Sequence, residues 1–218
     1  MSRFYFDSIR LEMGMGGRFL VRLFVYAFYG SLAAASIVLS FAELRWMQSL
    51  GVFLILLLID RLIHINQADR KLTELPQGKI NLNEYLLPTT TSIIEKASER
   101  CYFLGGHLEL WLLKQCFDQA EIKRGLKHLE IKWKVADKKV SQIIKVNQQR
   151  KTPKEEIKRL LEEVVQKAGE RALERGGRYV EPQDLFTVLA KSRLELTRDF
   201  FNSLDIRPED LEKKGIFG

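Results

Sequence analysis

Residues of the kinds that carry catalysis and metal binding are scarce in this chain of 218 residues. The two cysteines, Cys101 and Cys116, do not form a Cys-x-x-Cys pair, and none of the three histidines has a serine, cysteine or carboxylate partner at a diagnostic spacing. No Gly-x-x-x-x-Gly-Lys-Ser/Thr stretch occurs, which excludes the usual nucleotide-binding P-loop. The sequence therefore predicts no catalytic residue, no metal site, no cofactor and two ordinary buried thiols.

The alternation of apolar and polar residues that marks half-buried β-strands is also missing, so the predicted fold class is all-α. The clearest helix is expected over residues 152–175, with Thr152 as its N-cap, Pro153 at the first helical position and Glu155 completing a capping box. Gly176-Gly177 should end this helix with a left-handed cap. Apolar residues three or four positions apart form its expected buried stripe: Ile157, Leu160, Leu161, Val164, Val165, Ala168 and Ala172.

Long apolar runs, by contrast, are present near the N-terminus. Leu23–Ala42 is twenty residues without a charge, and a helix of that length rises about 30 Å, the thickness of a bilayer's hydrocarbon core. The next run, Trp46–Ile59, spans a bilayer only if it is extended to Ile65, with Arg61 reaching the headgroups. The two runs predict a transmembrane helical hairpin over residues 19–65. A cleaved signal peptide and a re-entrant second segment are the alternatives.

The distribution of positive charge predicts the orientation of this hairpin. Arginines occur in the N-terminal segment 1–18 and basic residues follow the second run, whereas the connector holds a single arginine. Because positive loops stay on the cytoplasmic side, we expect a multi-pass membrane protein with both termini in the cytoplasm. Residues 66–87, interrupted by Pro76-Gln77-Gly78, are expected to be a juxtamembrane linker to a soluble domain over residues 88–218.

The soluble part contains an internal duplication. Residues 95–106 (EKASERCYFLGG) align with residues 166–177 (QKAGERALERGG), and residues 125–131 (GLKHLEI) align with residues 200–206 (FFNSLDI), at spacings of 71 and 75. An apolar helical run lies between the two blocks in each copy. The expected repeats are residues 91–145 and residues 153–214.

The motifs of both copies resemble the repeat of the Clp N-terminal domain, the module at the head of Clp-type AAA+ unfoldases. The resemblance covers roughly residues 90–215, and the membrane hairpin is no part of the usual family pattern. In the second copy the matching residues are Ala168, Ala172, Gly176, Val180–Ala190 (VEPQDLFTVLA) and Phe200–Leu211 (FFNSLDIRPEDL). In the first copy they are Ala97, Gly105-Gly106, His107–Leu113 (HLELWLL) and Leu126–Ile131.

This resemblance implies a pseudo-twofold pair of four-helix repeats that binds protein substrates or adaptors and delivers them to a Clp-type AAA+ ATPase. Some members bind phosphorylated arginine through a glutamate, a position that is Gln183 in the second copy and about Gly106 in the first. Because neither residue can pair with a guanidinium as a carboxylate does, phosphoarginine recognition is not expected. His107 and Asp184 align with the next position of the motif and are expected to cap or position a helix start. These four residues are the candidate protein-binding positions.

Positive charge is concentrated in Lys123–Lys158, which holds twelve lysines and arginines against four acidic residues. A solvated helix surface explains this stretch, and contact with an anionic cytoplasmic leaflet is the functional alternative. No nucleic acid is expected as a partner, because no groove-reading motif is present. Five aromatic residues are expected to fill the core: Trp111, Phe117, Phe186, Phe200 and Phe201.

The sequence thus predicts a membrane-anchored substrate- or adaptor-binding module for protein quality control, not an enzyme. It is expected either to stand alone or to be the N-terminal part of a Clp unfoldase. The alternative is a structural membrane protein whose basic helical domain docks on anionic lipid or on a membrane complex.

Overall fold

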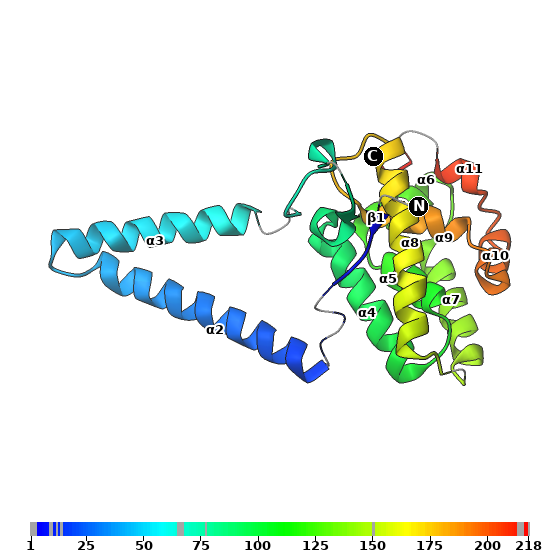
Figure 1. The fold of residues 1–218 in the computed structure, drawn as a ribbon, viewed down its shortest axis with the longest axis horizontal. Helices are drawn as coiled ribbons and strands as arrows, with labels where there is room; N and C mark the ends of the chain where they lie inside the picture. Colours follow the sequence, from blue (N-terminus) through cyan, green and yellow to red (C-terminus); the bar gives the residue numbers. More distant parts are fainter. Residues whose placement is uncertain are drawn as a thin grey trace. The chain divides into compact units, whose positions relative to one another are not determined.

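The computed structural model divides the chain into two compact units. One unit comprises residues 9–67, and the other combines residues 1–8 with residues 68–218. Helices dominate both units, as Figure 1 shows. The structure describes residues 4–8, 11, 13, 15–64, 68–76, 78–149, 151–212 and 216–217.

The first unit is a hairpin of two helices, α2 (Met15–Ser40) and α3 (Arg45–His64). Both have the length and the apolar composition of a membrane span, which confirms the expected pair of apolar helices. Only 6% of each candidate span is buried within the protein, so most of their apolar side chains face outward. Helices with this much exposed apolar surface are stable when an apolar environment, such as lipid or another protein's apolar surface, covers them.

The two helices approach each other closely near the connector. A Cβ atom added to Gly51 would lie 2.5 Å from the backbone nitrogen of Ser40 and 2.8 Å from the carbonyl oxygen of Ser36. The hydroxyls of Ser36 and Ser40 donate to carbonyls of their own helix, at Ala33 and Ser36, each over 2.8 Å. Small residues thus allow close packing while their polar atoms stay satisfied, as in many membrane helix pairs.

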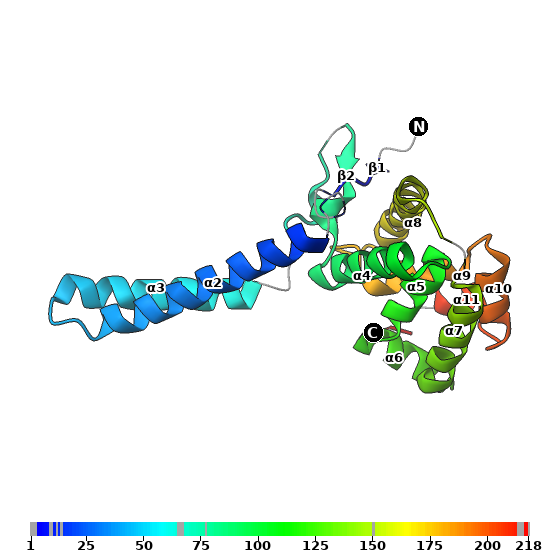
Figure 2. The same ribbon diagram turned by 90° about the horizontal axis from the view of Figure 1, so that it is seen from below.

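The second unit is a helical domain in which two short helices form the centre. These are α5 (Leu108–Cys116) and α9 (Pro182–Ala190), which lie side by side and are buried over most of their length (Figures 1 and 2). Around them lie α4 (Pro88–Leu104), α6 (Ala120–His128), α7 (Trp133–Asn147), α8 (Lys154–Glu174), α10 (Glu195–Asn202) and α11 (Pro208–Leu211).

The core of this domain is aromatic, as expected. Phe186 on α9 has its ring centroid 5.9 Å from that of Phe117 and 5.4 Å from that of Phe201, both in edge-to-face geometry. Phe200 adds a contact to Phe117 over 5.9 Å. All four rings are fully buried, and Trp111 is nearly so. Such pairs add about 0.5–1.5 kcal/mol each beyond the area they bury.

The expected helical character is confirmed, and a small β-sheet is added to it. Strand β1 (Phe4–Tyr5) pairs in parallel with strand β2 (Ile80–Asn81), and the Asn81 side chain bonds both backbone groups of Asp7, over 3.1 and 3.0 Å. Two residues per strand are too few to produce a visible alternation in the sequence. The domain is therefore mainly helical with one short parallel pair.

Residues 68–87 also differ from the expected linker, because they belong to the helical domain. They include the 3₁₀ helices η1 (Leu72–Glu74) and η2 (Leu82–Tyr85). The backbone N–H of Leu72 donates to the carbonyl of Arg178 over 2.7 Å, and that of Val180 donates to the carbonyl of Tyr85 over 2.9 Å. Five apolar residues of the segment are buried: Leu72, Ile80, Leu82, Tyr85 and Leu86.

The ends of α8 show one prediction confirmed and one wrong. Gly176 has a φ of +74°, and the Gly177 N–H donates to the Ala172 carbonyl over 2.8 Å, which is the expected left-handed cap. The expected Thr152 capping box is absent, because Pro153 is the N-cap residue and α8 starts at Lys154. The Thr152 hydroxyl instead donates to the Gly106 carbonyl over 3.0 Å.

Two further helix ends have non-glycine residues in the left-handed region. Glu130, after α6, has a φ of +59°, and Asp205, after α10, has a φ of +54°. In each case the next residue donates its N–H five residues back, from Ile131 to Leu126 over 2.8 Å and from Ile206 to Phe201 over 3.1 Å. Both helices therefore end in the same hydrogen-bonded turn.

Candidate functional site

The predicted position Asp184 is part of the capping box that starts α9. Its carboxylate accepts from the Glu181 backbone N–H over 2.9 Å, and the Glu181 side chain accepts from the Asp184 backbone in return. Arg175 donates to the same carboxylate through Nε and Nη2, each over 3.1 Å. Burial raises the pKa of Asp184, although the hydrogen bonds from Arg175 and Glu181 oppose this shift. Asp184 therefore joins the end of α8 to the start of α9.

Gly106, which the expected repeat aligns with Gln183, is occupied by internal contacts. It is buried, and its carbonyl accepts from the Thr152 hydroxyl over 3.0 Å and from the Cys101 thiol over 3.4 Å. The preceding carbonyl, of Gly105, accepts from the indole nitrogen of Trp111 over 2.8 Å. This corner thus connects the end of α4 to the segment that leads into α8.

The other two predicted positions are more accessible. Gln183 is half-buried on the first turn of α9 and donates to the Glu181 carboxylate over 2.5 Å. His107 is half-buried directly before α5 and lines a groove on the domain surface. Gly106, Gln183 and Asp184 are not among the residues that line this groove.

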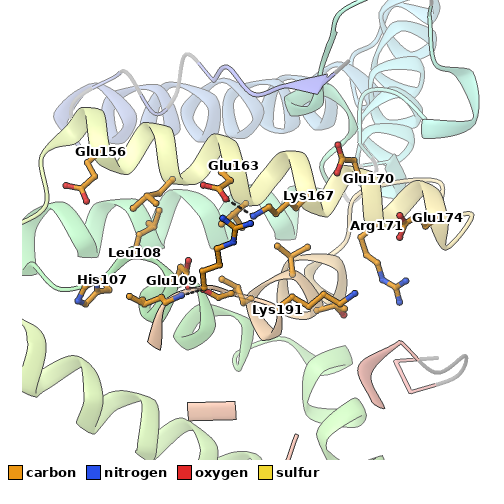
Figure 3. Close-up of a pocket in the computed structure, with 18 residues that line it drawn as sticks. His107, Leu108, Glu109, Glu156, Glu163, Lys167, Glu170, Arg171, Glu174 and Lys191 are labelled. Atoms are coloured by element: carbon orange, nitrogen blue, oxygen red, sulfur yellow. Dashed lines mark hydrogen bonds and ion pairs between the residues drawn. The ribbon is translucent and has the colours of Figure 1, made fainter. Parts of the chain in front are cut away.

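The groove is open, has a volume of about 680 Å³ and is bounded by three elements (Figure 3). One wall is the length of α8, and the other is formed by the start of α5 with the end of α9 and the loop that follows it. Its apolar floor is formed by Leu108, Leu160, Val164, Val188, Leu189 and Leu194. Because half of these side chains are only partly buried, apolar surface is accessible between the charged walls.

Both acidic and basic side chains line the α8 wall. Glu156, Glu163 and Glu170 are seven residues apart and therefore lie on one side of the helix. Lys167 donates to Glu163 over 2.6 Å, and this hydrogen bond, with the charges of Lys167, Arg193 and Arg159, lowers the pKa of Glu163. The wall thus presents charges of both signs, with the carboxylate ionised at neutral pH.

The opposite wall is rich in basic residues and is fixed by hydrogen bonds. Lys191 pairs with Glu212, and the Ser192 hydroxyl donates to Glu109 at the start of α5. The same hydroxyl accepts from the Leu194 backbone N–H over 2.9 Å. Ser192 therefore orders the loop between α9 and α10, which brings Lys191 and Arg193 to the groove.

The expected basic stretch is used in part by the fold itself. Lys139 donates to the carbonyl of Ser203 over 2.9 Å, and Asp137 pairs with Lys114 on α5. The Lys123 ammonium lies 4.6 Å from the centroid of the Trp133 ring, within cation–π range. These contacts connect α7 to its neighbours and reduce the charge that is available to a partner.

The potential metal ligands of the described residues are dispersed, and both thiols are buried. Within the ranges that the structure describes, no group of three histidine, cysteine, aspartate or glutamate side chains is placed to hold a metal ion. Both cysteines are buried, and burial, with a smaller effect of Asp118, raises the pKa of the Cys116 thiol. A thiol of this kind reacts slowly, because the thiolate is the nucleophile.

Sequence reasoning missed most residues of the groove. The two repeat motifs predicted protein-binding residues at the starts of helices. Of these predicted residues, His107 alone lines the groove. The seven-residue spacing of Glu156, Glu163 and Glu170 beside an apolar stripe was a usable signal. The basic residues after α9 gave no comparable signal, because only folding brings them opposite α8.

Comparison of this chain with known proteins gives no relative: no protein-family model, curated protein or solved structure matches it. Its function therefore has to be inferred from its own residues.

Proposed function

We propose that this chain is a membrane-anchored, Clp-N-type module that binds protein substrates or adaptors in protein quality control. In this proposal the α2–α3 hairpin crosses the membrane and both termini are cytoplasmic. The groove along α8 is the binding surface. The bound protein passes to a Clp-type AAA+ ATPase, which is either a separate partner or a later part of a longer chain.

The observation that carries the proposal is the agreement between the two halves of the helical domain. Helices α5 and α9 both have nine residues and start 74 residues apart, while α6 and α10, and also α7 and α11, start 75 residues apart. Glu130 and Asp205, the two non-glycine residues with positive φ in the described part of the chain, are 75 residues apart. Such residues are uncommon, so their equivalent placement supports an ancestral duplication.

The beginning of each copy supports the same relation. Gly105 and Gly176 are 71 residues apart, and both have a positive φ, at +77° and +74°. Each follows the long first helix of its copy, α4 or α8, and precedes the buried short helix. The copies diverge at their ends, where α11 has four residues and α7 has fifteen.

The groove supports the assignment of protein as the ligand. It is open at the surface and combines an apolar floor with charges of both signs, which suits a polypeptide segment better than a small molecule. Its walls come from both copies, since α5 belongs to the first and α8 and α9 belong to the second. A single segment lying along α8 would thus contact both halves of the domain.

A direct test measures binding of a permanently unfolded protein, fluorescently labelled carboxymethylated lactalbumin, to the full chain in lipid nanodiscs. We expect saturable binding that falls about tenfold with Leu160→Arg, because the substitution places a charge on the groove floor. Leu129→Arg is the matched control, since Leu129 is also a half-buried leucine but does not line the groove. The control should bind as the unmodified chain does.

Two results would contradict the proposal. One is the absence of binding by a chain that is folded and inserted in the nanodisc. The other is an equal effect of both substitutions, which would show that the groove is not the binding surface.

A further inference from the structure

A cluster of exposed apolar side chains lies at one end of the helical domain. Tyr102, Phe103 and Leu104 in the last turn of α4 are 54%, 55% and 52% exposed, and Val146 near the end of α7 is 80% exposed. Among the described residues of this domain, the other large apolar side chains that are exposed are Tyr5 and Val135. We refer to Tyr102, Phe103, Leu104 and Val146 as the apolar tip.

The backbone brings the two parts of the tip together. The turn after α4 passes through Gly105 and Gly106, with φ values of +77° and +86°. A Cβ atom on Gly106 would lie 3.7 Å from the carbonyl oxygen of Asn147, the residue after Val146. The Thr152 hydroxyl bonds Gly106 from the segment before α8, so the ends of α4 and α7 and the start of α8 meet (Figure 1).

Two contacts define the geometry of the tip. The rings of Tyr102 and Phe103 contact each other edge to face, with centroids 5.0 Å apart and an angle of 83° between the planes. Cys101, the residue before them, is completely buried, which fixes the last turn of α4 on the domain. The tip therefore presents an apolar surface to solvent.

The surroundings of the tip are basic. Residues 100–108 and 138–154 contain no aspartate or glutamate, and the acidic residues that bound these segments along the chain are Glu99, Glu109, Asp137 and Glu155. Exposed cations in these two segments include Arg100, Lys145, Lys151 and Lys154. An apolar cluster within such a surface has two properties of peripheral membrane-binding sites: aromatic side chains and an excess of nearby cations over anions.

We propose that the apolar tip docks on the surface of an anionic bilayer, with Tyr102, Phe103 and Leu104 at the level of the headgroups and the neighbouring cations on lipid phosphates. The inference depends on the membrane insertion of the hairpin in the proposed function, but not on the binding of proteins. Insertion keeps the domain at a high local lipid concentration, so that a weak docking site is sufficient.

Other occupants fit the tip less well. A symmetric contact with a second copy would bring the same cations face to face, which is unfavourable. The cores of protein–protein interfaces are depleted of lysine, whereas lysines surround this cluster. An anionic bilayer presents charged headgroups and, a few ångströms deeper, apolar chains. It therefore matches both the cations and the apolar side chains of the tip.

The test uses the full chain in nanodiscs with Val146→Cys labelled by an environment-sensitive nitrobenzoxadiazole dye; the native cysteines are buried and should not react. Nanodiscs of phosphatidylcholine are compared with nanodiscs in which about a third of the lipid is phosphatidylglycerol. We expect a blue shift and quenching by doxyl-labelled lipid in the anionic discs, both reversed by high salt. The matched control is Val135→Cys, an exposed valine on the same helix outside the tip, which should show neither effect.

A second variant separates docking from local unfolding. Phe103→Ser with Leu104→Ser should reduce the lipid quenching at position 146 several-fold, while the melting temperature stays close to that of the unmodified chain, because both side chains are already exposed.

Equal signals at positions 146 and 135 in an inserted chain would overturn this inference alone. Shielding at position 146 that depends on protein concentration and not on lipid charge would overturn it in favour of a second copy. A chain that fails to stay with the nanodisc would overturn the membrane part of the proposed function as well.

Discussion

The two units of this protein place the same kinds of side chain in opposite positions. Phe24 on α2 is 73% exposed, whereas Phe186 on α9 is fully buried against three other phenylalanines. In the helical domain the apolar residues pack against each other and the charged residues lie on the surface, because burying apolar surface away from water is favourable. In the hairpin they cover almost nothing within the protein. The difference is the one expected if lipid surrounds the hairpin and water the domain, as we propose, and substitutions at paired positions can test this.

The largest expected difference is between Phe186→Ala and Phe24→Ala. Phe186→Ala should destabilise the helical domain by about 3–5 kcal/mol, because it leaves a cavity in the aromatic core. Phe24→Ala should change the same domain by less than about 0.5 kcal/mol, as expected for an exposed position in the other unit. Hydrogen exchange of peptides from α5 and α9, in the full chain in nanodiscs, measures both effects. Similar protection in the two variants would contradict the division into units.

The next effect concerns the junction of α8 and α9. Asp184→Ala removes the capping carboxylate and leaves the partly buried Arg175 without its bidentate partner, so we expect a loss of about 2–4 kcal/mol. Gln183→Ala on the same turn is the control and should cost less than about 1 kcal/mol. Urea unfolding monitored by far-UV circular dichroism gives the comparison. Equal costs for the two variants would show that the Asp184 pair adds nothing to stability.

A third prediction compares two glycines within the hairpin. Gly51→Val should force α2 and α3 apart, because the added atoms would overlap the backbone of Ser40, at a cost of about 1–3 kcal/mol. Gly30→Val should be tolerated, since a Cβ atom at Gly30 has nothing within 4 Å. Energy transfer between dyes placed on the two helices, in nanodiscs, reports their separation. A larger change for Gly30→Val would mean that the helices pack differently in lipid.

The smallest expected effect is that of Thr152→Val, which removes the bond to the Gly106 carbonyl. We expect a loss of about 1 kcal/mol, the usual net value of one hydrogen bond in a protein. Thr91→Val on α4 is the control, because its hydroxyl bonds only to the carbonyl of Leu87, in its own helical turn. The difference in melting temperature measures the result. No difference between the two would indicate that water replaces the Thr152 hydroxyl at this site.

Predictions from the sequence succeeded where the signal was local. The apolar run of α2, the stripe and C-terminal glycine cap of α8, and the aromatic core were all expected from neighbouring residues and helical periodicity. Most of the stripe of α8 is buried as predicted, and Leu160 differs because it lines the groove. These features depend on interactions within a few turns.

Predictions failed where distant segments meet. The pairing of Phe4–Tyr5 with Ile80–Asn81, across the whole hairpin, has no local signal, and Thr152 was expected to cap its own helix when its partner is Gly106. The groove shows the same limit. Its α8 wall could be recognised from the spacing of Glu156, Glu163 and Glu170, but its second wall could not.

The sequence by itself determined that this protein has an apolar helical pair and a charged helical remainder, because periodicity, composition and capping act between neighbours in the chain. The tertiary structure decided which polar groups are consumed by the fold and which remain accessible. Asp184 and Gly106 became internal connections, whereas the α8 groove and the apolar tip became surfaces. Whether a group is internal or accessible depends on burial and on hydrogen bonds to distant residues, which form only when the chain folds.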